Sequence, residues 1–207
     1  MTAMLYFTRC AAYTEPRIDN DPNYFDYQDV YKTFKGLKGG KGFFWLYAFS
    51  FDSPHTKGKT CVLFNVEELS DSGITYSSHF FKNGKEDSIQ YTGTFNTSDS
   101  EYSTEGKKRQ SPNILHAELR NAVGEWPMDY QLIVSDYDTC ALFRVLGKVE
   151  NGIGCMVLVS DSAARGGGIP EKCKNIYRSA CDQHQNRLKQ IFTDSCQRSK
   201  FKNVITP

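Results

Sequence analysis

The sequence predicts a mainly β protein: an eight-stranded antiparallel up-and-down barrel, with one helix before it and a disulfide-pinned helix after it. Eight strand-like runs follow one another between residues 43 and 160, and turn signals separate them. No helical pattern lies between these runs, which excludes a parallel α/β sheet. Six of the seven cysteines lie in the same region or just after it, at wide spacings that indicate three disulfides.

The predicted N-terminal helix begins at Asp21, which can act as the N-cap, with Pro22 at the first helical position. Apolar side chains then follow at helical spacing, namely Tyr27, Val30, Tyr31 and Phe34. A glycine-rich stretch over residues 36–42 ends this helix.

The eight predicted strands are 43–51, 60–66, 74–81, 88–95, 114–119, 130–135, 140–146 and 155–160. Asn83-Gly84 and Asn151-Gly152 are the strongest two-residue hairpin signals. The strands alone fit either a barrel or a sandwich. After them, residues 163–168 have the composition of a flexible linker, and a second helix is expected from Pro170, with one apolar stripe that runs to Phe192. This order of a helix, eight strands and a helix is typical of a lipocalin, whose barrel encloses one small ligand.

The length and composition limit the number of domains and the classes of partner. A chain of 207 residues suits one domain, which we expect at 21–197, between a signal remnant or disordered N-terminus at 1–20 and a basic flexible tail at 198–207. The net charge of +1 gives no attraction to nucleic acid, and no apolar run reaches the roughly 20 residues that a membrane-spanning helix needs. We expect no membrane and no nucleic-acid partner, and a monomer.

Catalytic and metal-binding motifs are missing from the sequence. There is no Cys-x-x-Cys pair, nucleophile elbow or phosphate-binding loop, and the four histidines are scattered, at His55, His79, His116 and His184. His116 and Glu118 could mimic an acid/base pair, but a surface strand pair is the more ordinary interpretation. We therefore expect no enzyme, no cofactor and no metal site.

The cysteines also predict the compartment, because disulfides persist in oxidising surroundings outside the cell. Met1–Phe7 is apolar apart from Thr2, but Arg9 cuts the run short, so we expect a truncated secretion signal and a mature start between residues 11 and 21. Cys10 would then be lost, which leaves six cysteines. Asn96, in Asn96-Thr97-Ser98, is the predicted glycosylation site of a secreted chain.

Five short segments carry a family resemblance: 29–34 (DVYKTF), 60–62 (TCV), 135–140 (SDYDTC), 169–173 (IPEKC) and 192–196 (FTDSC). Each is weak alone, but their order and the strand count make the set specific. Together they resemble the tick salivary lipocalins, which include the histamine-binding proteins. The resemblance implies the pairings Cys61–Cys196 and Cys140–Cys173, together with Cys155–Cys181, an extra bridge found in part of that family.

The resemblance fails at the residues that would hold an amine. Amine-binding members carry one carboxylate in a Cys-Asp-aliphatic motif and a second in a later Glu-Leu-aromatic motif. The matching stretches here are Cys140-Ala141-Leu142 and Cys155-Met156-Val157, so both carboxylates are missing. A buried ammonium needs a paired carboxylate, and the family's lower amine site is therefore expected to be absent. Asp52 is the best remaining acid, with Glu67, Glu68, Asp87 and Glu118 behind it; a solvent-facing strand-end acid is the alternative for each.

The first strand has two faces, and the resemblance places Phe44, Leu46 and Ser50 inward. Its other face would pack beneath a helix and consists of Phe43, Trp45, Tyr47, Phe49 and Phe51. Further candidates for the ligand cavity are Tyr76, Tyr91, Trp126, Tyr130, Leu132 and Phe143, each of which could equally be ordinary core.

The resulting functional hypothesis is a secreted salivary-type lipocalin that sequesters a small host mediator. Family resemblance favours a biogenic amine such as histamine or serotonin, whereas the missing carboxylates favour a fatty acid or an eicosanoid. The alternative is an immunomodulator that binds a host protein and requires no small ligand.

Overall fold

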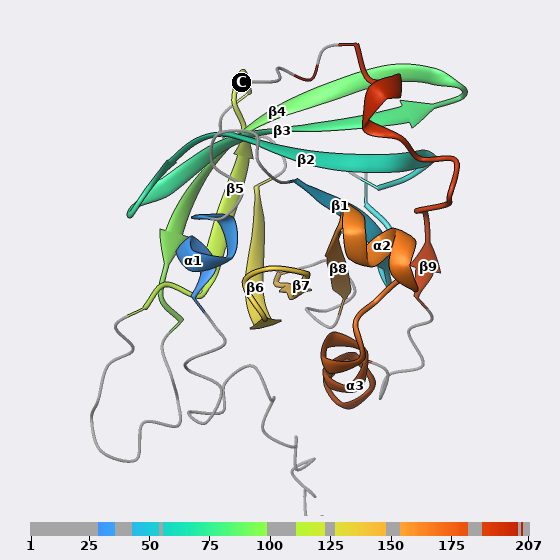
Figure 1. Cartoon of the computed structure of the whole chain (residues 1–207). Coiled ribbons are helices and arrows are strands. Elements are labelled where there is room, and N and C mark those ends of the chain that lie inside the picture. Colours follow the sequence, from blue (N-terminus) through green and yellow to red (C-terminus); the bar gives the residue numbers. More distant parts are fainter. Residues whose placement is uncertain are drawn as a thin grey trace, which may run out of the picture.

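The fold is a closed barrel of eight antiparallel strands (Figure 1), as the sequence predicts. The computed structural model describes residues 29–35, 43–53, 56–98, 111–122, 127–147, 154–181, 188–202 and 204. The strands are β1 (Phe44–Phe49), β2 (Lys59–Ser70), β3 (Gly73–Lys82), β4 (Lys85–Asn96), β5 (Ile114–Leu119), β6 (Met128–Ser135), β7 (Cys140–Val145) and β8 (Cys155–Ser160).

Strand β1 closes the barrel, because it pairs with β8 on one side and with β2 on the other. Phe44 lies opposite Ser160 of β8 and also opposite Phe64 of β2. Every other strand pairs with its neighbours in chain order, from β2 to β8. The sandwich that the strand pattern alone left open is thereby excluded.

The hairpin between β3 and β4 has the turn that its sequence predicts. Asn83 and Gly84 have φ angles of 52° and 75°, the left-handed pair that a two-residue type I′ turn requires. The second predicted hairpin, at Asn151-Gly152, lies outside the described residues.

Alternation along the strands gives the sheet two apolar faces. The inner face fills the barrel with a cluster that includes Phe44, Leu46, Tyr76 and Phe143. The outer face carries a second cluster around Trp45, which the C-terminal segments cover. All six paired cysteines belong to this outer cluster, so the disulfides lie outside the cavity.

Helix α1 (Val30–Lys35) begins where Asp29 caps it, since Asp29 Oδ1 accepts a hydrogen bond from the backbone N–H of Lys32 at 2.9 Å. The predicted start at Asp21 lies outside the described residues.

Residues 161–166 form helix α2 (Asp161–Gly166), so the prediction of a flexible linker here is wrong. Ser160 caps this helix through its side-chain oxygen, which accepts from the N–H of Ala163, and Gly167, with a φ angle of 142°, ends it. Asp161 also accepts a hydrogen bond from the Trp45 indole at 2.8 Å, which attaches α2 to β1.

Helix α3 (Glu171–Ala180) is shorter than predicted, because the helix does not extend to Phe192. Residues Lys189–Gln190 form the short strand β9, which pairs with β1. The backbone oxygen of Tyr47 accepts hydrogen bonds from the N–H groups of Ile191 and Phe192. Phe192 therefore reaches the outer cluster from an extended backbone, where its ring stacks on Tyr47 at 5.5 Å.

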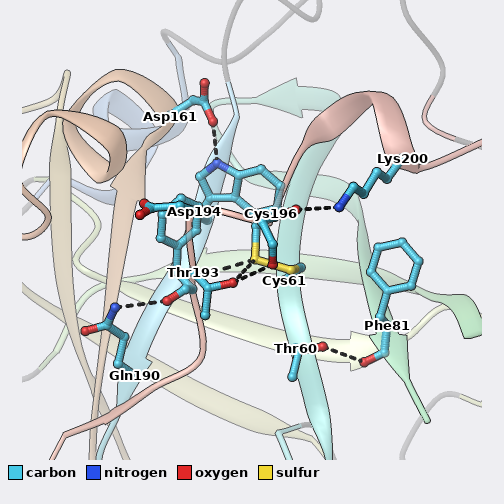
Figure 2. Close-up of a disulfide and its surroundings, with 12 residues drawn as sticks. Thr60, Cys61, Phe81, Asp161, Gln190, Thr193, Asp194, Cys196 and Lys200 are labelled. Atoms are coloured by element: carbon cyan, nitrogen blue, oxygen red, sulfur yellow. Dashed lines mark hydrogen bonds between the residues drawn. A yellow bond between two sulfur atoms is a disulfide. The ribbon is translucent and has the colours of Figure 1, made fainter. Parts of the chain in front are cut away.

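The three disulfides pair as the family resemblance implies: Cys61–Cys196, Cys140–Cys173 and Cys155–Cys181. The last two attach α3 and the residue after it to β7 and β8. The first joins β2 to the C-terminal segment beside the Asp161–indole hydrogen bond (Figure 2).

Part of the segment assigned to a flexible tail is built into the fold. Residues Arg198–Lys200 form a 3₁₀ turn, η5, and Phe201 after it is only 6% exposed. The Phe201 ring packs on Phe81 at 4.9 Å and on Trp45 at 6.3 Å. No helix among the described residues is long and apolar enough to span a membrane.

Candidate functional site: the barrel interior

A cavity of about 40 Å³ lies inside the barrel. Its lining comes from α1, from most of the strands, and from Phe51 and Thr56 between β1 and β2. The lining residues are Phe34, Leu46, Phe51, Thr56, Val62, Phe64, Val66, Ile74, Tyr76, Ser78, Tyr91, Leu115, Tyr130, Met156 and Leu158.

The polar groups of this lining are neutral hydroxyls. Among the described residues, no carboxylate and no basic side chain lines the cavity. Burial raises the pKa of Tyr76, Tyr91 and Tyr130, so the three phenols stay protonated at physiological pH. Each phenol can donate one hydrogen bond and accept others. The site can therefore orient a largely apolar molecule, but it offers no countercharge to an ammonium.

Aromatic rings define the shape of the cavity. Tyr76 and Tyr91, opposite each other on β3 and β4, stack with ring centroids 5.0 Å apart. At another part of the lining, Phe34 of α1 stacks between Phe95 and Phe143, with centroids 6.5 Å and 6.2 Å away. The N-terminal helix motif thus places one aromatic side chain in the barrel interior.

Four of the predicted ligand residues line the cavity: Leu46, Tyr76, Tyr91 and Tyr130. Phe44, Leu132 and Phe143 are buried in the same inner cluster but do not line the cavity. Trp126 lies outside the described residues.

Ser50 and Asp52 do not line the cavity. Ser50 Oγ accepts a hydrogen bond from the backbone N–H of Cys155 at 2.9 Å, which binds β1 to β8. The Asp52 side chain is 69% exposed and forms an ion pair with Lys189 at 2.8 Å. In this structure, neither residue is available to a ligand inside the barrel.

A β-bulge at Tyr47 explains this difference from the predicted faces. Leu46 lies opposite Leu158, but Ala48 lies opposite the next residue, Val157, so β1 has one residue more than β8 at this point. The alternation changes face there. Phe49 and Phe51, expected on the outer face with Trp45, instead join the inner cluster, and Phe51 lines the cavity.

The other acidic candidates also lie outside the cavity lining. Glu67 pairs with Arg120 at 2.6 Å, and Glu68 and Asp87 are exposed. His116 contacts Asp129 at 2.6 Å and Glu118 at 3.6 Å, all three partly exposed. This geometry is that of a surface group of charges on β5 and β6.

The prediction missed Phe34, Thr56 and the inner face of β2, and on other strands it missed Ile74, Ser78, Leu115, Met156 and Leu158. Val62, Phe64 and Val66 occur at every second position of β2, so period-2 alternation was a usable signal for them. Thr56 had no such signal, since it lies in the turn before β2. The Asn96 side chain is exposed at the end of β4, and its glycosylation stays a prediction.

Comparisons with known proteins agree with this geometry. A family model described as tick histamine binding protein matches residues 18–198. Among curated proteins, no sequence matches the chain.

Solved structures of similar fold include AM182 in a serotonin complex (16% identity, 82% of this chain and 92% of that chain, TM-score 0.53). Others are Japanin from Rhipicephalus appendiculatus bound to cholesterol (12% identity, 75% and 96%, TM-score 0.50) and lobster apocrustacyanin A1 (11% identity, 84% and 91%, TM-score 0.52). At these identities the likeness shows the fold.

Proposed function

Because the chain belongs to the tick histamine-binding protein family, a family of lipocalin-type ligand binders, we propose that it is a secreted protein that sequesters a small, largely apolar host mediator. The observation that carries the proposal is the cavity lining, which combines aromatic and aliphatic side chains with neutral hydroxyls and contains no described carboxylate. The three disulfides support an oxidising, extracellular location.

A fatty acid or an eicosanoid suits this interior better than histamine or serotonin. A buried ammonium that lacks a carboxylate partner loses its hydration without compensation, at a cost of several kcal/mol. The two stretches that match the acidic motifs of amine-binding relatives, Cys140-Ala141-Leu142 and Cys155-Met156-Val157, contain no acid, and Met156 of the second stretch lines the cavity. An acyl chain needs only apolar contact, which this lining supplies.

The cavity is too small for such a ligand unless it enlarges on binding. Pockets that bury a drug-sized molecule measure about 300–1,000 Å³, far more than the roughly 40 Å³ of this interior. Binding of such a molecule therefore requires inner side chains, foremost the stacked Tyr76 and Tyr91, to move apart. The same observation favours a second candidate, an immunomodulator that binds a host protein through its surface and leaves the interior filled.

A calorimetric ligand panel tests the proposal. Histamine, serotonin, arachidonate and a leukotriene are titrated into the wild-type protein, and we expect heat of binding from the lipids and none from the amines. Ser78→Leu, which fills the lining, is expected to weaken lipid binding at least tenfold, whereas the same change at exposed Ser88 leaves binding unchanged.

Each result selects one candidate. Amine binding that exceeds lipid binding would overturn the choice of ligand class. Lipid binding that is unchanged in Ser78→Leu would show that the lipid binds outside the barrel interior. No binding of any of the four, in protein that is folded, would favour the protein-binding candidate.

A further inference from the structure

Lys59 is the first residue of β2, and its basic side chain lies on the inner side of the sheet. It lies directly opposite Lys82 in the β2–β3 register, and directly opposed residues share a face. Lys82 has the same parity on β3 as Ser78 and Phe80, and Ser78 lines the cavity. The Lys59 backbone N–H also bonds to the oxygen of Thr56, another lining residue, so Lys59 lies next to the Thr56–Ser78 end of the cavity.

The Lys59 side chain is buried, and the part of the chain that the structure describes gives it no hydrogen-bond acceptor. The residue is 4% exposed, and its Nζ atom has no hydrogen-bond partner among the described residues. Its Nζ atom lies over the face of the Phe80 ring, 3.9 Å from the centroid. Phe80 is itself only 1% exposed and belongs to the inner cluster.

The neighbouring charged side chains, Lys82 and Asp87, do not neutralise the positive charge of Lys59. Lys82 has the same sign, and Asp87, opposite Phe80 on β4, is exposed and accepts a hydrogen bond from the N–H of Ser88. Burial, followed by repulsion from Lys82, lowers the pKa of Lys59 to about 8, although Asp87 acts in the opposite direction. The side chain is thus still mostly protonated at neutral pH.

An unpaired buried ammonium is costly, and a cation–π contact compensates only part of that cost. A carboxylate placed against Nζ would restore charge-assisted hydrogen bonds, which are about twice as strong as neutral ones. An acyl chain attached to that carboxylate would then lie along the aromatic lining.

We propose that Lys59 is an anion-binding subsite inside the barrel that takes the carboxylate of an amphiphilic ligand whose apolar chain occupies the cavity. The subsite deepens the proposed function and rests on it. It also gives the ligand an orientation, with its carboxylate toward the Lys59 end and its chain toward Tyr76 and Tyr91.

The test compares arachidonate with arachidonyl alcohol, which has the same chain and no charge. Dissociation constants are measured for the wild type, for Lys59→Met and for Lys57→Met, the control at an exposed lysine in the turn before β2. Octanoate, a short carboxylate, is titrated into the same three proteins. Met is close to Lys in size, and urea unfolding confirms that each variant is folded.

We expect the wild type to bind arachidonate at least tenfold more tightly than the alcohol. Lys59→Met should remove this preference by weakening arachidonate alone, and Lys57→Met should leave it unchanged. Equal affinity for acid and alcohol in the wild type, or a preference that survives in Lys59→Met, overturns the subsite while the lipid-binding function stands.

Failure of the function gives a different pattern. Octanoate binding that depends on Lys59, without binding of arachidonate, supports the subsite and contradicts sequestration of long-chain lipids. If the wild type binds none of the three probes, both proposals are wrong.

Discussion

At the scale of single residues, Asp136 shows how one polar side chain can hold a turn in place by accepting backbone hydrogen bonds. Asp136, in the turn between β6 and β7, accepts hydrogen bonds from the backbone N–H groups of Asp138, Thr139 and Cys140. It organises the turn that leads into Cys140, which explains structurally why an acid occurs in the SDYDTC segment. Burial by itself raises the pKa of Asp136, but the hydrogen bonds, led by the one from the Thr139 side chain, outweigh it and hold that pKa below its usual value.

Asp136→Ala should therefore destabilise the protein by about 2 kcal/mol, since it leaves several backbone donors without their acceptor. Asp138→Ala, at an exposed neighbour, is the control and should change the free energy of unfolding by less than about 0.5 kcal/mol. Urea unfolding at neutral pH measures both. Equal effects of the two variants would contradict the role of Asp136 in the turn.

His116 gives the second prediction at this scale. The hydrogen bond to Asp129 is the main cause that raises its pKa, against the opposing effect of burial. Because the folded pKa lies above the unfolded value near 6.5, His116 stabilises the protein fully below about pH 6.5, and this contribution is lost as the pH rises through the folded pKa.

His116→Gln should accordingly lower the free energy of unfolding more at about pH 5.5 than at about pH 8.5. The comparison with the wild type at each pH cancels the contribution of buried His79, whose pKa burial lowers and whose pH dependence has the opposite sign. A loss that is larger at the alkaline pH would refute the assignment.

At the scale of elements, the C-terminal segment acts as a cover for the outer face of the barrel. It is extended from Lys189 to Phe192, is joined to β2 by the Cys61–Cys196 bridge, and ends on β3 with Phe201 against Phe81 and His79. The backbone N–H of Lys202 also donates to Glu86 of β4 at 3.0 Å. The segment thus crosses several strands that are distant from it in the sequence.

Phe201→Ala should lower the free energy of unfolding by about 3 kcal/mol, because it removes a buried ring from the outer cluster. Lys200→Ala, at an exposed neighbour, should cost less than about 1 kcal/mol. Chemical denaturation compares the two. An effect of Phe201→Ala as small as that of Lys200→Ala would mean that this segment does not cover the barrel in solution.

At the scale of the molecule, the disulfides differ in how much of the chain they constrain. Cys61–Cys196 spans 135 residues and links the start of the barrel to the C-terminal segment, whereas Cys155–Cys181 spans 26 residues. In the chain-entropy account, the longer loop restricts the unfolded state more.

Replacement of both cysteines of a pair by serine should therefore cost about 5 kcal/mol for Cys61–Cys196 and about 3.5 kcal/mol for Cys155–Cys181. Unfolding midpoints and denaturant slopes of the two double variants test this order under identical oxidising conditions. The reverse order would show that native packing around the bridges, and not loop length, decides their contribution.

The sequence by itself determined the number and order of the eight barrel strands, the Asn83-Gly84 turn and, through the family segments, all three disulfides. These features depend on periodicity, turn chemistry and short motifs, which are properties of neighbouring residues. Of the nine predicted ligand residues with a described position, four line the cavity, namely Leu46, Tyr76, Tyr91 and Tyr130, because their strands keep a regular alternation up to the site.

The tertiary structure alone decided which residues line the cavity beyond the bulge. It also decided that residues 188–192 are extended and not helical. The bulge at Tyr47 is a mismatch between β1 and β8, so no pattern within β1 reveals that Phe51 turns inward while Asp52 faces solvent. Likewise, residues 188–192 have a helical apolar pattern, but the backbone oxygen of Tyr47 on β1 accepts hydrogen bonds from the N–H groups of Ile191 and Phe192, which holds this segment extended. Both outcomes depend on a partner strand far away in the sequence, and only folding brings that partner into contact.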